Sequence, residues 1–230
     1  MLNDDIIKVD YEVYSTAYSI RKHLPKLLAA NKVMSFDVET RSIYDAEQRE
    51  DAKEYLKELP TSDPYYKQAM MVSNSSGLSF PSLVRTTHFI FAENINKSHI
   101  FICTDDSLEL YIWNMVADYG GKWLIWNALF DLKICYQKVS KLPKNYVDGM
   151  LQLKCLINHV NVYKAKTRLK EFVGHRYPPA WSLYNDYEPA NLKDEAFLKY
   201  CAMDGSSTIL AHNLIEEEFE NTRLRKVESQ

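Results

Sequence analysis

Short apolar runs rich in β-branched and aromatic residues alternate along the chain with longer stretches of mixed polarity that begin at Ser, Thr or Asp. The first pattern predicts β-strands and the second predicts helices. The expected strands cover residues 6–14, 32–42, 85–93, 97–104 and 122–126. The expected helices cover residues 15–30, 44–59, 105–121, 127–139 and 193–222. This order predicts an α/β fold with a mixed sheet flanked by helices.

The segment at about residues 41–86 stands apart from this pattern. Residues 44–59 are highly charged and end at Pro60, and residues 71–82 have the Ser, Asn, Gly and Pro content of a loop. We therefore expect a single domain over residues 1–230 that carries an insertion at about 41–86, packed at one end of the sheet.

The expected strand at residues 32–42 has an unusual second face. Side chains alternate along a strand, so Phe36 and Val38 point one way while Asp37 and Glu39 point the other. Two neighbouring carboxylates repel each other, which costs free energy unless a positive charge lies between them. The strand therefore indicates a site that binds a cation.

Two expected helices carry residues of the same kind. Asp131 lies one turn after Asn127 in the helix that follows an apolar strand. Tyr200 and Asp204 are four residues apart, so they share one face of the last helix. Apolar neighbours surround Asp204, and a carboxylate near a buried surface needs a partner.

Convergence of Asp37, Glu39, Asp131 and Asp204 at one end of the sheet would require metal ions to offset the repulsion between the acids. Hard oxygen ligands select Mg²⁺ or Mn²⁺ over zinc, and paired carboxylates suit two cations about 4 Å apart. We therefore expect two divalent cations, Mg²⁺ or Mn²⁺. Such a pair serves the hydrolysis of phosphodiesters.

Composition restricts the other classes of function. With 46% hydrophobic and 26% charged residues the chain has the composition of a soluble globular protein. Its formal charge of −3 argues against binding nucleic acid chiefly through a strong positive field. We find no membrane span, no signal peptide and no metal-binding spacing among the four cysteines. We expect a cytoplasmic location (the host cytoplasm if the chain is viral) and no membrane partner.

Three short motifs resemble a known family. The stretches "FDVET", "NALFD" and "YCAMD" occur in the order of the three motifs of the DEDD 3′–5′ exonucleases, and the resemblance extends from about residue 6 to residue 215. Tyr200 precedes Asp204 by four residues, as in the tyrosine branch, whereas the histidine branch has His where this chain has Lys199. The tyrosine branch includes proofreading domains of family A DNA polymerases, their phage relatives and ribonuclease D-like enzymes. The resemblance implies the ribonuclease H-like fold.

The resemblance also implies roles for the acids and the tyrosine. Asp37, Glu39 and Asp204 would hold the ion that activates water. Asp37 would also bridge to a second ion, which Asp131 supports. Tyr200 would orient the attacking water through its hydroxyl, because an unperturbed phenol titrates too high to be a strong base.

The remaining roles concern the substrate. By the same resemblance, Asn127 and the backbone around Thr40 would hold the terminal nucleotide. Ile43 stands where the family often places an apolar wedge between the last two bases. The aromatic residues Trp181, Tyr184 and Tyr187 are further candidates for stacking on bases.

The leading hypothesis is a metal-dependent 3′–5′ exonuclease that hydrolyses single-stranded DNA ends to nucleoside monophosphates. It would proofread for a phage-type DNA polymerase that is separately encoded or missing, so a polymerase subunit is a candidate partner. Two alternatives stay open. One is an RNA exonuclease of the ribonuclease D kind, and the other is a non-catalytic module that tethers a polymerase.

Overall fold

The structure, a computed structural model, describes residues 6–75, 80–157, 169, 172–178 and 191–228. Within these residues a six-stranded sheet has the order β1-β4-β3-β2-β5-β6. The strands are β1 (Asp10–Tyr14), β2 (Val33–Ser42), β3 (Val84–Asn94), β4 (Lys97–Ile102), β5 (Lys122–Ile125) and β6 (Tyr146–Asp148). Only β3 runs antiparallel to its neighbours, while β1–β4, β2–β5 and β5–β6 are parallel pairs. The predicted mixed sheet is confirmed.

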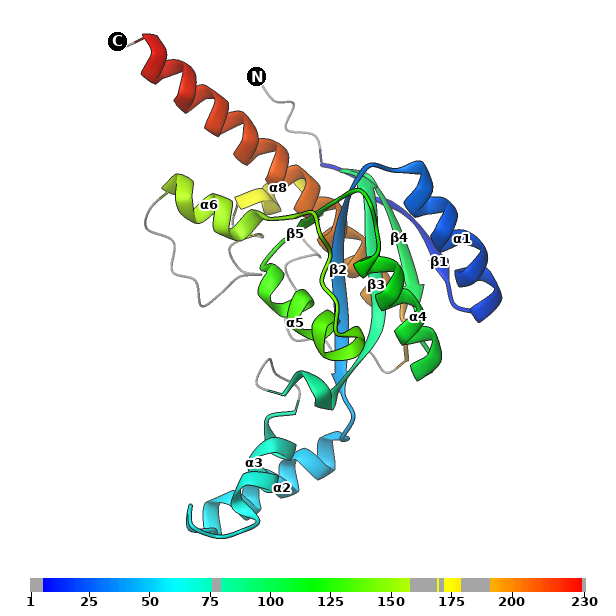
Figure 1. Cartoon of the computed structure of the whole chain (residues 1–230), viewed down its shortest axis with the longest axis vertical. Helices are drawn as coiled ribbons and strands as arrows, with labels where there is room; N and C mark the ends of the chain where they lie inside the picture. The colour runs from blue at the N-terminus through cyan, green and yellow to red at the C-terminus, as the bar shows by residue number, and fades with distance from the viewer. Residues whose placement is uncertain (1–5, 76–79, 158–168, 170–171, 179–190, 229–230) are drawn as a thin grey trace.

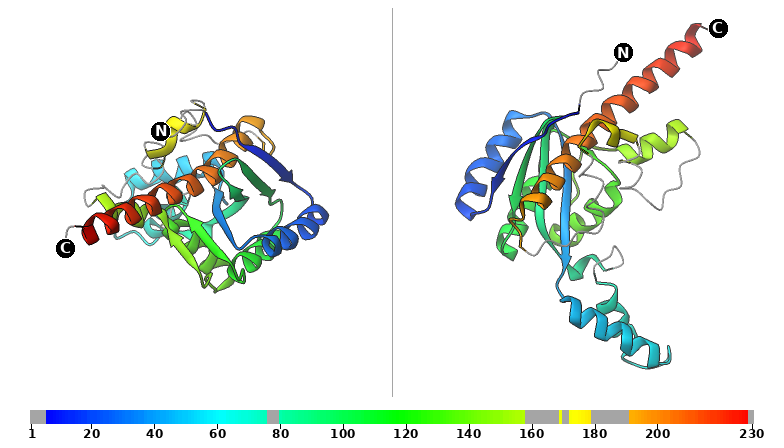
Figure 2. Two further views of the ribbon diagram at one scale, coloured as in Figure 1. Left: turned by 90° about the horizontal axis from the view of Figure 1, so that it is seen from above. Right: turned by 180° about the vertical axis from the view of Figure 1, so that it is seen from behind.

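Helices cover both faces of this sheet (Figures 1 and 2). On one face lie α1 (Ala17–Ala30), α4 (Asp106–Ala117) and α5 (Ala128–Val139). On the other lie α6 (Gly149–Ile157) and the long α8 (Glu195–Glu228). The alternation of β3 separates the two cores, because Phe89 and Phe91 pack toward the first set of helices and Ile90 toward the second.

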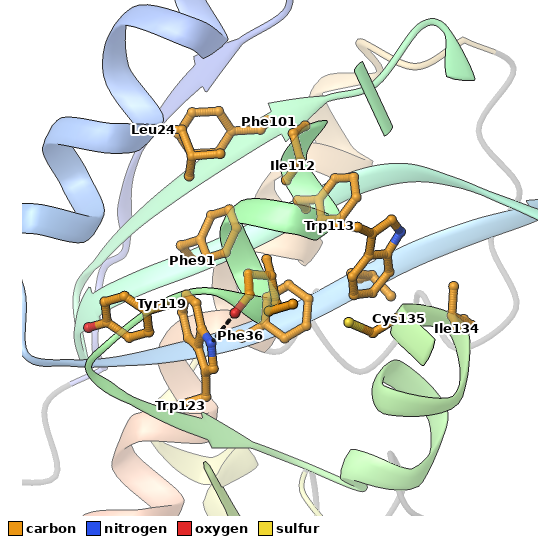
Figure 3. Packing of buried hydrophobic residues seen from close by; sticks show 14 of the residues in the cluster. Leu24, Phe36, Phe91, Phe101, Ile112, Trp113, Tyr119, Trp123, Ile134 and Cys135 are labelled. Atoms are coloured by element: carbon orange, nitrogen blue, oxygen red, sulfur yellow. Dashed lines mark hydrogen bonds between the residues drawn. The ribbon is translucent and has the colours of Figure 1, made fainter. Parts of the chain in front are cut away.

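Aromatic side chains fill the core between the sheet and helices α1, α4 and α5 (Figure 3). The ring centroid of Phe36 lies 5.5 Å from that of Phe91, 5.7 Å from that of Trp113 and 5.3 Å from that of Trp123. The indole of Trp123 donates a hydrogen bond to the carbonyl oxygen of Val116 (3.0 Å). This packing holds one face of β2 rigidly, which leaves its other face to carry polar groups.

Helix α8 lies against the sheet, and small residues line their contact. The Ser35 hydroxyl donates to the carbonyl oxygen of Gly205 (2.7 Å), and the Ser98 hydroxyl donates to that of Ala202 (2.8 Å). A Cβ atom added at Gly205 would lie only 2.7 Å from Cγ2 of Ile90. The short approach brings residue 204 of α8 next to strand β2.

Residues 43–75 and 80–83, between β2 and β3, form an arm at the end of the sheet where β2 ends (Figure 1). The arm contains α2 (Ala46–Glu58), which buries none of its residues, and α3 (Tyr66–Ser73). Figure 2 shows both helices projecting away from the sheet and its flanking helices. The loop expected at 71–82 is wrong in part, because α3 continues to Ser73 and Pro81–Leu83 form a 3-10 turn. That the arm is an insertion into one domain of residues 1–230 stays a prediction.

No helix in the described parts of the chain combines the length and the apolar composition needed to cross a membrane.

Candidate metal and active site

The carboxylates of β2 lie on the face that α8 covers. Asp37 and Glu39 are half-buried there, while Phe36 and Val38 are buried in the core on the opposite face. The strand therefore has the alternation that its sequence predicts. The apolar face anchors the strand, so the two acids extend from a rigid backbone.

A β-bulge lies directly at Glu39. Glu39 is paired with His88 and the next residue, Thr40, with Thr86, so Thr87 is an extra residue in β3. The Thr87 hydroxyl donates a hydrogen bond to the backbone carbonyl oxygen of Glu39 (3.1 Å). Bulges change the direction of side chains and often lie beside active sites. Here the extra residue determines the course of the backbone that carries Glu39.

A buried ion pair on the other side of the sheet holds the same bulge. Glu109 of α4 is 2% exposed, and its Oε1 atom accepts a hydrogen bond from the backbone N–H of Thr86 (2.8 Å). The ammonium of Lys138 in α5 lies 3.1 Å from the same carboxylate. The indole of Trp113 donates to the Thr86 hydroxyl (3.1 Å). These contacts lock β3 at the bulge, and sequence reasoning missed them.

Helix α8 supplies the third acid. Tyr200 and Asp204 are both buried, with 2% and 3% of their surfaces exposed. One carboxylate oxygen from each of Asp37, Glu39 and Asp204 lies within 4.8 Å of the others. The structure thus brings together three of the four predicted acids, from elements far apart in the sequence, and this group is called the carboxylate cluster below.

The fourth acid, Asp131, lies in the first turn of α5 and is 1% exposed. It is outside the group whose ligand atoms lie within 4.8 Å of one another. The Oδ1 atom of Asp131 and the Oδ2 atoms of Asp37 and Asp204 are buried, and none has a hydrogen-bond partner in the described part of the chain. A role for Asp131 at a second cation stays a prediction.

The start of α5 depends on an aspartate that sequence reasoning missed. Asn127 precedes the helix in the left-handed region (φ 64°, ψ 57°). The Asp148 carboxylate at the end of β6 accepts hydrogen bonds from the backbone N–H groups of Asn127 (3.2 Å) and Ala128 (2.9 Å). It also accepts one from Met150 (3.0 Å) at the start of α6. Asp148 therefore fixes where α5 begins, and with it the positions of Asn127 and Asp131.

Two of the predicted substrate residues, Thr40 and Ile43, lie beyond the carboxylate cluster toward the arm, whereas Asn127 lies at the start of α5. Thr40 follows Glu39 at the bulge. Ile43 is 52% exposed, and its backbone N–H donates to the carbonyl oxygen of Leu83 (2.9 Å), so it lies where β2 meets the arm. The aromatic residues proposed for stacking, Trp181, Tyr184 and Tyr187, lie outside the described residues.

A buried histidine lies beside Glu39 on the same face of the sheet. Burial lowers the pKa of His88, which favours the neutral ring. Its Nε2 atom donates to the carbonyl oxygen of Leu192 (2.9 Å), just before α8, and its ring packs against Phe197. His88 therefore fixes the start of α8 against β3.

Solved structures share the fold of this chain at low sequence identity. Escherichia coli RNase D, an exoribonuclease involved in structured RNA processing, is 12% identical, with a TM-score of 0.57 over 93% of this chain and 46% of its own. The chain thus spans about half the length of that enzyme. Brucella melitensis NrnC is 11% identical, with a TM-score of 0.54 over 97% of this chain and 88% of its own.

Ligands are present in some of these structures. Trypanosoma brucei RNase D was solved in complex with RNA U12 and is 13% identical, with a TM-score of 0.55 over 89% of this chain and 61% of its own. Other NrnC structures contain Mg²⁺ or pGG. No family model and no curated protein sequence matches the chain. The similarity shows the ribonuclease H-like fold that the motifs imply.

Proposed function

We propose that the protein is a metal-dependent 3′–5′ exonuclease of the DEDD type that shortens single-stranded nucleic acid. The observation that carries the proposal is the carboxylate cluster, in which Asp37, Glu39 and Asp204 converge within 4.8 Å. The cluster lies on a fold shared with RNase D and NrnC. Fold and cluster are independent observations, and both agree with the three motifs in the sequence.

The donor set of the cluster fits a hard divalent cation. Three carboxylates supply oxygen ligands only, which favours Mg²⁺ or Mn²⁺ over metals that prefer sulfur or imidazole. Asp37, Glu39 and Asp204 would hold one cation, and Asp37 with Asp131 would hold a second. Such cations supply the charge that activates water and stabilises the leaving oxygen. NrnC, which shares the fold, has been solved with Mg²⁺.

The other residues of the site position the reacting groups. Tyr200 is buried one helical turn before Asp204, so its hydroxyl would orient the attacking water on the side of α8. Asn127 and the backbone at Thr40 would hold the terminal nucleotide, and the exposed Ile43 would separate the last two bases. These groups raise the rate by orienting the scissile bond rather than by exchanging protons.

RNA is the substrate that the comparisons favour. RNase D of E. coli is an exoribonuclease, and RNase D of T. brucei was solved with RNA. The ribonuclease D-like alternative therefore agrees better with the comparisons than DNA proofreading does. No compared protein named here is a polymerase, so a polymerase partner stays a prediction. A pure tethering module would not need three convergent carboxylates.

Digestion of matched RNA and DNA oligonucleotides tests this proposal. Each 5′-labelled strand would be incubated with Mg²⁺ or Mn²⁺ and the parent protein, Asp37→Ala, or the control Asp118→Ala, which changes an exposed acid far from the cluster along the chain. We expect a ladder that shortens from the 3′ end with the parent and the control, and none with Asp37→Ala or a chelator. Faster digestion of RNA would support the preferred substrate. Intact strands of both polymers with the parent would contradict the proposed function.

A further inference from the structure

Two arginines lie opposite each other on the neighbouring strands β2 and β3, just beyond the carboxylate cluster. Arg41 of β2 is directly paired with Arg85 of β3, two residues beyond Glu39. Like charges directly opposite each other on neighbouring strands are destabilising. An antiparallel pair of this kind is therefore retained at a cost, and an anion bound between the two guanidinium groups would offset that cost.

The arginines line a cavity of about 330 Å³. Its wall also includes Ile43 at the start of the arm, Thr104 after β4, and Leu192 just before α8. Thr87 lines the cavity as well, and its hydroxyl is bonded to the backbone of Glu39. The cavity therefore adjoins the bulge at Glu39, at the end of the sheet where the arm begins.

The charges on the cavity wall do not cancel. Arg85 forms an ion pair with Asp106 (2.7 Å), in which both side chains are largely exposed. Arg41 forms no ion pair within the described part of the chain. The other acid on the wall, Asp45, directs its Oδ1 atom at the backbone N–H of Gln48 (2.8 Å), where it caps α2. The cavity thus keeps at least one guanidinium charge available in a chain whose formal charge is −3.

We propose that Arg41, supported by Arg85, binds a phosphate of the nucleic-acid strand that is being shortened. This inference rests on the proposed exonuclease function and adds a second point at which the strand is held. A guanidinium forms paired, charge-assisted hydrogen bonds with phosphate. Phosphate and carboxylate are the two anions whose geometry it matches best. Two residues along a strand correspond to about 6.6 Å. This places the phosphate near the scissile bond, and not at a distant surface.

The ion pair with Asp106 does not account for this arrangement. It explains why Arg85 is tolerated, but Arg41 would remain as an exposed charge opposite another cation. A solvent-exposed arginine without a ligand would be expected to contribute to binding in the same way as any other surface cation. The proposal instead requires that Arg41 interacts with one particular phosphate of the strand.

A double-mutant cycle between protein and substrate tests this requirement. The parent, Arg41→Gln, Arg41→Lys and the control Lys26→Gln, an exposed cation on α1, would each digest a set of oligonucleotides. Each oligonucleotide carries one neutral methylphosphonate at a different linkage. Because a charge-assisted hydrogen bond is lost, Arg41→Gln should raise KM about tenfold on the unmodified strand, with kcat within about twofold. Arg41→Lys should recover part of the loss, and the control should match the parent.

The position of the coupling decides the outcome. We expect one linkage at which the methylphosphonate raises the KM of the parent about tenfold but leaves the KM of Arg41→Gln unchanged. Equal losses for both proteins at every linkage would overturn the inference. A second experiment uses adenosine monophosphate as an inhibitor. If Arg41→Gln changes only this inhibition, the arginine binds the released nucleotide and the inference is wrong.

The test distinguishes failure of this inference from failure of the proposed function. A parent that digests unmodified strands but shows no coupling contradicts only the phosphate site. A parent that digests nothing contradicts the exonuclease function. If the parent digests nothing, the same cycle is measured with the dissociation constants of fluorescent strands. Equal constants for the parent and Arg41→Gln would then overturn the phosphate site as well.

Discussion

Buried or half-buried carboxylates occur on both sides of the β2–β3 pair, and the two groups differ in what surrounds them. On the side of α4, Glu109 has the N–H of Thr86 and the ammonium of Lys138 as partners. On the side of α8, Asp37, Glu39 and Asp204 have one another within 4.8 Å. The first acid brings opposite charges and donors together, and the second group brings like charges together.

This difference distinguishes an acid that has partners within the fold from acids that we propose to bind a cation. Glu109 completes the hydrogen bonding of a bulge, so its charge is useful to the folded chain without any ligand. The carboxylate cluster gathers three acids, and in the proposed function a bound cation offsets the repulsion between them. Substitutions on the two sides should therefore change the stability of the cation-free protein in opposite directions.

The largest expected effect is the loss of stability in Glu109→Ala. This change leaves Lys138 and the Thr86 N–H at a largely buried site without their partner, which costs about 3–5 kcal/mol. Asp37→Asn removes one of three converging charges and should leave the free energy of unfolding unchanged or higher. Urea unfolding in the presence of a chelator would measure both. Equal destabilisation by the two variants would show that Asp37 is also a structural acid.

Cation binding gives the next effect and should depend on the cluster alone. A cation that binds only the folded protein stabilises it by about 2.7 kcal/mol at one hundred times its dissociation constant. Mg²⁺ or Mn²⁺ should therefore raise the melting temperature of the parent and have little effect on Asp204→Asn. The matched control is Asp118→Asn, which changes an exposed acid outside the cluster and should keep the rise. A rise of equal size in Asp204→Asn would place the cation elsewhere.

The two groups also differ in how far the sequence predicts them. The cluster was predicted because each acid lies in a short motif within an apolar element, and the motif order of a known family is present. Glu109 carries no such signal, since it resembles any polar position of an amphipathic helix. Its burial and its pairing with Lys138, 29 residues later, arise only when α4 and α5 pack together. Local patterns do not determine such contacts.

The same limit applies to the fold. Strands β3 and β4 were predicted because both contain short runs of Phe and Ile, residues that favour strands. Strand β6 has three residues, too few for a periodic pattern, so it and its Asp148 were missed. The end of α3 was predicted as loop because Ser73 and the Asn and Ser residues that follow it outweighed the helical signal of the residues before them. Which backbone groups Asp148 caps depends on tertiary structure alone.

A smaller effect is expected where α8 contacts the sheet. Gly205→Ala would place a Cβ atom 2.7 Å from Cγ2 of Ile90, so the helix must shift. Overpacking of this kind costs about 1–3 kcal/mol. The shift would move Asp204 relative to Asp37, so cation affinity and activity should fall together. Gly120→Ala is the matched control, because a Cβ there would meet no atom within 4 Å. Full activity in Gly205→Ala would show that the site tolerates movement of α8.

The smallest effect is expected at Thr87, the extra residue of the bulge, which connects the two groups. Its neighbour Thr86 is held by Glu109, and its own hydroxyl donates to the Glu39 carbonyl oxygen (3.1 Å). Thr87→Val removes that hydrogen bond and the contact of the same hydroxyl with Nδ1 of His88 (2.9 Å) at nearly constant volume, and it should cost about 1 kcal/mol of stability. Because the backbone of Glu39 would be less well held, cation affinity should fall several-fold, and Thr87→Ser should restore it. Cation titrations followed by melting temperature would measure this change. If Thr87→Val lost stability but kept the affinity of the parent, the bulge would support the fold without positioning the carboxylate cluster.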